Sequence, residues 1–267
     1  GRVHQPDLRT HRGVLTMNLT LFGVEIWATA LLFARIGGMV MLLPGLGEPA
    51  VPPRIRLAFA LAMAIALGPN LADRVPAAAP TAFGMAGQIA GEAIIGILLG
   101  GAARMLVSAV ATAGQILGLE IGIAFAQTAD PTQTQSGQLL AVFLGIMGVA
   151  LIFATGLHHM FLAGIAGSYE VISLGTPPPV GDAAQLALEA AATSFRVGFQ
   201  IAVPVVAAGL IFRVGLGVLS RLIPQIQVFF VALPLQIMGG LVVFALGIST
   251  GMLIWLDSLQ TYATWLR

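Results

Sequence analysis

The stretch VFFVALPLQIMGGLVVFALGISTGMLIWL, residues 228–256, has 29 residues and no charged side chain. About 20 apolar residues in a helix cross the hydrocarbon core of a bilayer, so this run is long enough for one full crossing. Two more uncharged runs, residues 139–157 and 197–212, contain 19 and 16 residues. Because a chain inside lipid must satisfy its own backbone hydrogen bonds, these runs predict membrane-spanning helices.

The composition of the whole chain is that of an integral membrane protein. Of its 267 residues, 58% are hydrophobic and 9% are charged, and the mean hydropathy is +0.96. A soluble domain carries about 25% charged residues. The absence of cysteine excludes disulfides and thiolate metal sites, and the net charge of +1 gives no sign of nucleic-acid binding. We therefore expect an all-α integral membrane protein that binds no nucleic acid.

Prolines, glycines and polar residues divide the chain into six apolar segments, which we expect to form kinked helical hairpins. The second segment is short for one crossing, and the third is so long that it should be bent, broken or partly outside the lipid. Residues 17–267 are expected to form a single membrane domain, whereas the polar residues 1–16 are interpreted as an upstream or non-native extension. The segments are 19–43, 55–68, 83–127, 139–166, 184–220 and 226–263.

The last two segments each carry a proline near the middle, Pro204 and Pro234. Proline removes one helical hydrogen bond and kinks the axis, which membrane helices tolerate when neighbouring groups satisfy the freed carbonyl. The polar residues between the segments predict a hairpin turn that includes Arg221, Pro224 and Gln225. In such an antiparallel pair the two kinks are expected to face each other approximately.

Ionisable residues inside apolar segments are informative because an unpaired charge in hydrocarbon costs several kcal/mol. Neighbouring ones lie too far apart along the sequence to pair within one helix. Their partners must come from other segments of the chain, from other chains or from water. A further alternative is that they take part in a proton relay or contact a substrate. The candidates for pairing between subunits are Glu25, Arg35, Glu92, Arg104 and Glu120, and Arg196 is a sixth residue of this kind.

The stretch GQILGLEIGIAFAQTADP, residues 114–131, places Gly114, Gly118, Gly122 and Ala126 at intervals of four. If the stretch is helical, these residues form a smooth strip that another backbone can approach closely. If it is not helical, they make a loop able to bend around a cavity. Both interpretations remain open at the level of the residues alone.

Nothing in the sequence points to catalysis or to a bound cofactor. The adjacent His158 and His159 would point about 100° apart on a helix, and no acidic or cysteine cluster accompanies them, so no metal site is predicted. No nucleophile, base and orienting group cluster together. We expect a protein that is not an enzyme and needs no cofactor.

Four ordered blocks of the sequence resemble the FliR family, also called SctT, the export-gate subunits of flagellar and virulence type III secretion systems. The resemblance covers nearly everything from Met17 onward, and the sequences DPTQTQSG and HHMF are more similar to flagellar members than to the virulence ones. The blocks are PGLGEPAVPPRIRLAFALAMAIALGP (44–69), TAGQILGLEIGIAFAQTADP (112–131), TGLHHMFLAGIAGSYEVISLG (155–175) and GVLSRLIPQIQVFFVALPLQI (217–237).

The resemblance implies one copy of this chain beside several FliP-like and FliQ-like subunits, with an FlhB-like protein as a further partner, around a pore for unfolded exported proteins. The chain would be a FliP-like part followed by a FliQ-like hairpin, about 184–263, in the bacterial inner membrane at the flagellar basal body. In the family the central glycine-rich stretch contributes to the plug that closes the pore. Carried over to this sequence, the plug residues are Gly114, Gly118, Gly122, Phe125 and Ala126.

Besides a scaffold that makes no contact with the pore, two alternatives to a flagellar gate subunit remain. The first is the corresponding subunit of a virulence secretion system. The second is a secondary transporter, because broken helices and charges inside the membrane are also features of that class. A transporter of this kind is built from inverted repeats, and none is apparent in the sequence.

Overall fold

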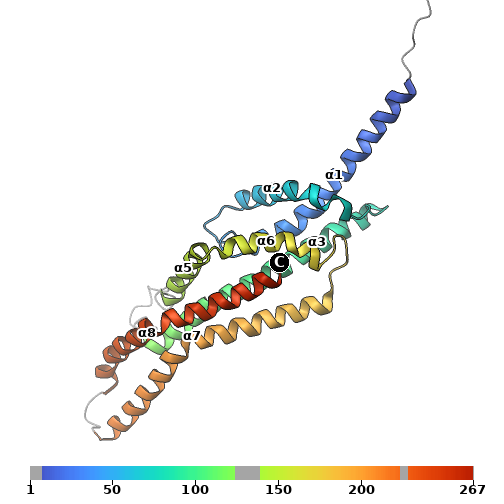
Figure 1. Ribbon diagram of the computed structural model, residues 1–267. Helices are drawn as coiled ribbons and strands as arrows, with labels where there is room; N and C mark the ends of the chain where they lie inside the picture. Colours follow the sequence, from blue (N-terminus) through green and yellow to red (C-terminus); the bar gives the residue numbers. More distant parts are fainter. Residues whose placement is uncertain (1–7, 124–138, 223–227, 267) are drawn as a thin grey trace, which may run out of the picture. The chain divides into compact units, whose positions relative to one another are not determined.

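The structure, a computed structural model, describes residues 8–123, 139–222 and 228–266, with the side chains of 25–123, 139–222 and 232–266. In these ranges the chain is helical, with no strand (Figure 1). This confirms the predicted all-α class. The helices are α1 (Leu8–Leu42), α2 (Pro53–Leu71), the short 3₁₀ helix η1 (Ala72–Arg74), α3 (Ala82–Ile121), α5 (Leu139–Ala154), α6 (Leu157–Val171), α7 (Val180–Leu222) and α8 (Val228–Trp265).

Five of the described helices are long and apolar enough to cross a membrane, and α5 with α6 raises the number to six if that bent pair forms one span. The helices α3 and α7 contain 40 and 43 residues. At the rise of an α-helix they are about 60 and 65 Å long, roughly twice the thickness of the hydrocarbon core. The third predicted segment is therefore one continuous helix up to Ile121, and it is longer than a single crossing perpendicular to the membrane needs.

Two predicted segments differ from the helices that the structure contains. The second is longer than expected, because α2 begins at Pro53, where proline is compatible with the first turn of a helix, and continues past Pro69. The fourth is broken: α5 and α6 meet at an angle of 74°. The break contains Gly156 with φ of +74°, a backbone conformation that glycine adopts without steric cost. In addition, residues 8–16 are helical and belong to α1.

The chain folds as two compact units, each assembled from separate pieces of the sequence. The border passes within α3 and within α6, so both helices contribute residues to both units. The first unit consists of Gly1–Leu42, Leu46–Gly100 and Ile165–Val180, and the second of Leu43–Gly45, Gly101–Gly164 and Gly181–Arg267.

In the first unit, α1 and α3 cross at very short range. A Cβ atom on Gly38 would lie 2.9 Å from the carbonyl oxygen of Ala93, and one on Gly100 would lie 2.8 Å from that of Met39. A Cβ on Gly96 would lie even closer to the backbone carbonyl of Arg35. Small residues permit such close packing of membrane helices, and the spacing of Gly96 and Gly100 is the GxxxG pattern associated with it.

In the second unit, α7 and α8 form an antiparallel pair, in agreement with the predicted hairpin. A Cβ on Gly247 would lie 3.6 Å from Pro204, and one on Gly251 would lie 3.2 Å from Ile201. Because Pro204 faces Gly247, it does not face Pro234, and the expectation that the two kinks oppose each other is wrong. In an antiparallel pair, residues lie opposite each other when they are equally far along the chain from the connection between the helices. Pro204 and Pro234 are not equally far from it.

Candidate functional site

The first unit contains a buried ion pair between α1 and α3. Arg35 Nε lies 2.6 Å from Glu92 Oε2, and both side chains are 0% exposed. The second carboxylate oxygen of Glu92 accepts a hydrogen bond of 2.6 Å from the backbone N–H of Gly175. The guanidinium carbon of Arg35 also lies 4.5 Å from the centre of the Tyr169 ring, within the range of a cation–π interaction.

The remaining donors of Arg35 bind the carboxyl end of α6. Nη1 donates to the carbonyl oxygens of Ser168 at 3.1 Å and Ile172 at 2.7 Å, and Nη2 donates to that of Ser173 at 3.4 Å. The C-terminal end of a helix carries partial negative charge, so a guanidinium there interacts favourably with the helix dipole. The carbonyls of Ser168 and Ser173 also accept backbone hydrogen bonds from Ile172 and Thr176. The Arg35–Glu92 network therefore connects α1, α3 and the end of α6.

Arg35 and Glu92 were candidates for pairing between subunits, and in the structure they follow the alternative of a partner in another helix of the same chain. Each residue has the other as its partner within one chain, and no part of either side chain is accessible to another subunit. The sequence did not indicate this pair because its members are 57 residues apart. The close crossing of α1 and α3 at Gly96 brings them together.

A second ion pair lies at the C-terminal end of α3, in the second unit. Arg213 Nη2 of α7 is 2.8 Å from Glu120 Oε2, with side-chain exposures of 48% and 20%. From α8, the Gln236 side-chain amide donates to the backbone oxygen of Glu120 at 2.8 Å. Gly209 leaves room for the carboxylate, because a Cβ there would lie 3.0 Å from Glu120 Oε2. Glu120 thus has a partner within the chain as well.

The other charged candidates are less buried. Glu25 is exposed on α1. Arg104 is half-buried on α3 and interacts with another residue of the chain. Arg196 is exposed on α7, and no acidic group within the described ranges lies at ion-pair distance from it.

The glycine strip begins as a close helix–helix contact. Gly114 and Gly118 are buried in α3, and a Cβ on Gly114 would lie 2.5 Å from the backbone nitrogen of Ala141 in α5. The helix ends at Ile121, followed by Gly122 with φ of +89°. Of the two interpretations, helix packing therefore applies to Gly114. Phe125 and Ala126 lie outside the described residues.

One of the three residues of the predicted hairpin turn is helical in the structure. Arg221 is exposed in the last turn of α7, which ends at Leu222, and α8 begins at Val228. Pro224 and Gln225 lie outside the described residues. The two histidines stand just after the bend between α5 and α6, with ring centres 4.0 Å apart. Within the described ranges, no three histidine or acidic side chains are arranged to hold a metal ion.

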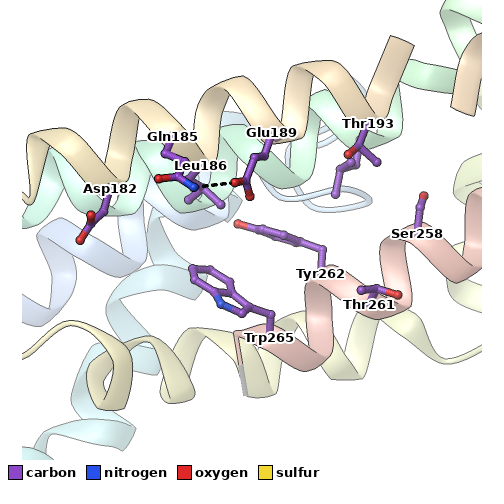
Figure 2. A pocket seen from close by; sticks show the side chains of 11 residues that line it. Asp182, Gln185, Leu186, Glu189, Thr193, Ser258, Thr261, Tyr262 and Trp265 are labelled. Carbon is purple, nitrogen blue, oxygen red and sulfur yellow. Dashed lines mark hydrogen bonds between the residues drawn. The ribbon is translucent and has the colours of Figure 1, made fainter. Parts of the chain in front are cut away.

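A cavity that the sequence patterns did not predict lies at the opposite end of the hairpin, where the first turns of α7 meet the last turns of α8. Its volume is about 450 Å³. Figure 2 shows Asp182, Gln185 and Glu189 on α7 across from Tyr262 and Trp265 on α8. Periodicity places each set on one face of its own helix, but only the antiparallel fold brings the two faces together.

Comparison with known proteins assigns the chain to a family. Residues 26–262 match the family described as bacterial export proteins, family 1. This chain belongs to that family. The resemblance found in the four sequence blocks is thereby confirmed.

Several relatives of this export protein are similar over most of their length. The flagellar biosynthetic protein FliR of Caulobacter vibrioides is 39% identical over 241 residues, which cover 90% of this chain and 96% of the relative. The FliR proteins of Bacillus subtilis and Escherichia coli are 30% and 28% identical, over 79% of this chain in each case and over 82% and 80% of the relatives. The family match includes Arg35, Glu92, Glu120 and Arg213, whereas Glu25 lies just before it.

Proposed function

We propose that this chain is the FliR-type subunit of the flagellar type III export gate and helps to form and close the pore through which unfolded flagellar proteins leave the cell. The observation that carries the proposal is the family match over residues 26–262, together with relatives named flagellar biosynthetic protein FliR. The corresponding location is the bacterial inner membrane at the flagellar basal body. The partners would be FliP-like and FliQ-like subunits and an FlhB-like protein.

The dimensions of the helices support a place in a larger assembly. With about 65 Å of length, α7 exceeds the hydrocarbon thickness about twofold, so lipid alone cannot cover its apolar side chains. Large apolar side chains are exposed along α7 and α8, and exposed apolar residues in such numbers indicate contact with protein or lipid. Examples are Leu210, Ile211, Val214, Leu235, Met238 and Leu246.

Within this function we propose that the glycine strip contributes to pore closure. The residues are Gly114, Gly118 and Gly122, and the family resemblance adds Phe125 and Ala126. The close packing at Gly114 and the left-handed conformation of Gly122 support a stretch that is anchored at one end and turns sharply at the other. The role is that of a passive conduit, with energy supplied by other components.

Co-expression with candidate FliP-like and FliQ-like proteins, followed by mass measurement of the purified assembly, tests the proposal. We expect this chain to purify as one copy together with several copies of the others. A chain that purifies only as a separate monomer when all candidates are present would contradict it. Deletion of the gene should also abolish motility, and its return should restore swimming.

One observation is shared with the alternative of a secondary transporter. The 74° break between α5 and α6 is the kind of broken helix that lines transporter substrate sites. A transporter acts without other subunits, so the purified chain in liposomes would take up a solute. Such uptake would overturn the export-gate proposal, and a virulence rather than flagellar gate would be indicated if motility survived deletion of the gene.

A further inference from the structure

The cavity between α7 and α8 has a chemically uneven lining. Its charged groups are the carboxylates of Asp182 and Glu189, and its lining contains no arginine, lysine or histidine. No basic residue of the described chain lies within ion-pair distance of either carboxylate. The Gln185 side-chain amide donates to Glu189 Oε1 at 2.8 Å and leaves Oε2 available. The cavity therefore carries two negative charges that the lining does not balance.

The hydroxyl groups of the cavity add further acceptors. Ser258 donates its hydroxyl hydrogen to the carbonyl oxygen of Trp255 at 2.7 Å, and Thr261 donates to that of Asp257 at 2.9 Å. Because both hydrogens are used within α8, each oxygen offers only lone pairs to a ligand. This is a second property, independent of the carboxylates, that favours a ligand rich in hydrogen-bond donors.

The α8 wall presents aromatic surface to the same space. The rings of Tyr262 and Trp265 are stacked, with centres 6.0 Å apart and planes 29° from parallel. They reach from α8 toward Asp182 and Glu189 on the other wall (Figure 2). Trp265 is 50% exposed, whereas Tyr262 is almost buried. Aromatic faces attract cations, and tryptophan does so most strongly.

We propose that this cavity is a docking site for an arginine side chain of a neighbouring subunit. Among biological cations, a guanidinium matches the lining best, because it is planar, stacks on aromatic rings and presents five donors in a fork that suits carboxylates. An ammonium group would use the charge but neither the ring stacking nor the paired acceptors. The inference rests on the proposed function in one respect, since it requires that the chain has neighbours.

The cavity is open to the surface, as expected for a site at an interface between subunits. Asp182, Gln185 and Glu189 are exposed on α7, so a side chain can enter from outside without a change in the fold. The apolar residues of the lining include Leu106, Leu186 and Ala190. A volume of about 450 Å³ lies in the range of ligand pockets and accommodates the long arginine side chain with the backbone that carries it.

Crosslinking tests the identity of the occupant. Because the chain has no cysteine, Gln185→Cys gives a unique attachment point for a photoreactive thiol reagent in the wall of the cavity, with both carboxylates retained. In the purified assembly with FliP-like and FliQ-like subunits, we expect the crosslinked peptide to belong to one of them and to contain an arginine. Crosslinks only to lipid, or to peptides without arginine, would overturn the proposal.

Charge variants test the energetics. The double variant Asp182→Asn with Glu189→Gln keeps the shape of the cavity and should lower the fraction of partner retained in detergent about tenfold, the effect of losing roughly 1.4 kcal/mol. Asp257→Asn is the matched control, because Asp257 is exposed on α8 outside the cavity. An unchanged unfolding temperature of the double variant shows that it still folds.

The reversed pair distinguishes a direct contact from a general charge effect. Glu189→Lys should lose the partner, and changing the crosslinked arginine to glutamate in the same assembly should restore it. If the double neutral variant retains its partners like the control, the cavity proposal fails and the proposed function stands. If the unaltered chain assembles with no candidate subunit, both proposals fail.

Discussion

Arg35 of α1 and Glu92 of α3 are ion-pair partners at 2.6 Å in an interior from which solvent is fully excluded. Such a pair contributes little net stability compared with apolar residues, but removal of one member leaves the other as an uncompensated buried charge. Here Arg35 also donates hydrogen bonds to backbone carbonyl oxygens at the end of α6. The pair is therefore a structural requirement of the first unit.

Arg35→Met should destabilise the protein by about 3–5 kcal/mol, because Glu92 would be left as a buried charge. The measurement is thermal unfolding of the purified chain in detergent. Arg74→Met is the matched control: Arg74 is paired with Glu170 at 2.6 Å, but the two side chains are 50% and 64% exposed. An exposed pair is worth roughly 0–1 kcal/mol. Equal unfolding temperatures for the two variants would contradict this account of Arg35.

The double variant Arg35→Met with Glu92→Leu should regain part of the stability that Arg35→Met loses. Replacing both members of a buried pair by apolar residues removes the uncompensated charge. Recovery should remain incomplete, because the carbonyl of Ile172 and the N–H of Gly175 would still lack their partners, and the carbonyl of Ser168 would keep only its bond from the N–H of Ile172. The same unfolding measurement checks this, and a double variant less stable than Arg35→Met would exclude the explanation.

Glu120 and Arg213 should show a smaller coupling, since both are partly exposed. We expect each single neutral variant, Glu120→Gln or Arg213→Gln, to cost about 1 kcal/mol. The reversed pair Glu120→Arg with Arg213→Glu should recover much of the loss caused by Glu120→Arg alone. A double-mutant cycle of unfolding free energies measures the coupling, and strictly additive effects would show that the pair is not energetically linked.

Gly114→Val should disturb the packing of α3 against α5, because any side chain at Gly114 meets the backbone of Ala141. Overpacking of this kind costs about 1–3 kcal/mol. Gly145→Ala is the control within α5: a Cβ there meets nothing within 4 Å, and alanine favours the helix. The unfolding temperature in detergent should therefore be lower for Gly114→Val and unchanged or higher for Gly145→Ala. The reverse order would refute the close contact.

Gly122→Val should impair motility and pore sealing, because a branched residue does not adopt a φ of +89° without strain of about 1–3 kcal/mol. Gly122→Asn should be milder, since asparagine tolerates the left-handed region. Gly118→Val provides a second test within the buried strip. Swimming assays and ion leakage through assembled gates in vesicles are the measurements, and normal results for both valine variants would remove the strip from the closing mechanism.

The membrane class and most helices could be predicted because the length of an uncharged run is a local property. The hairpin of α7 and α8 followed from two such runs joined by a short polar stretch. The break between α5 and α6 was missed, although Thr155 and Gly156 stand at the junction, because the apolar run continues past them. Glycine at that position permits a helix to continue as well as to stop.

The contacts of the candidate site could not be predicted, because they join residues that are far apart in the sequence. Unmatched charges correctly indicated that Arg35 and Glu92 need partners elsewhere, but the choice between another helix and another subunit required the fold. The sequence does contain one signal of this contact, because the GxxxG spacing of Gly96 and Gly100 marks the surface on which α1 and α3 meet. The cavity depends on the register of α7 with α8, which neither helix encodes alone.

The arrangement of the first unit also constrains the order of events during biosynthesis. Glu92 is synthesised 57 residues after Arg35, and Ser168 follows 133 residues after it. Nascent domains form from the amino-terminal end as the ribosome proceeds. If α1 enters lipid before α3 is synthesised, Arg35 has no ion-pair partner there, at a cost of several kcal/mol. Release of α1 together with α3 would avoid that cost.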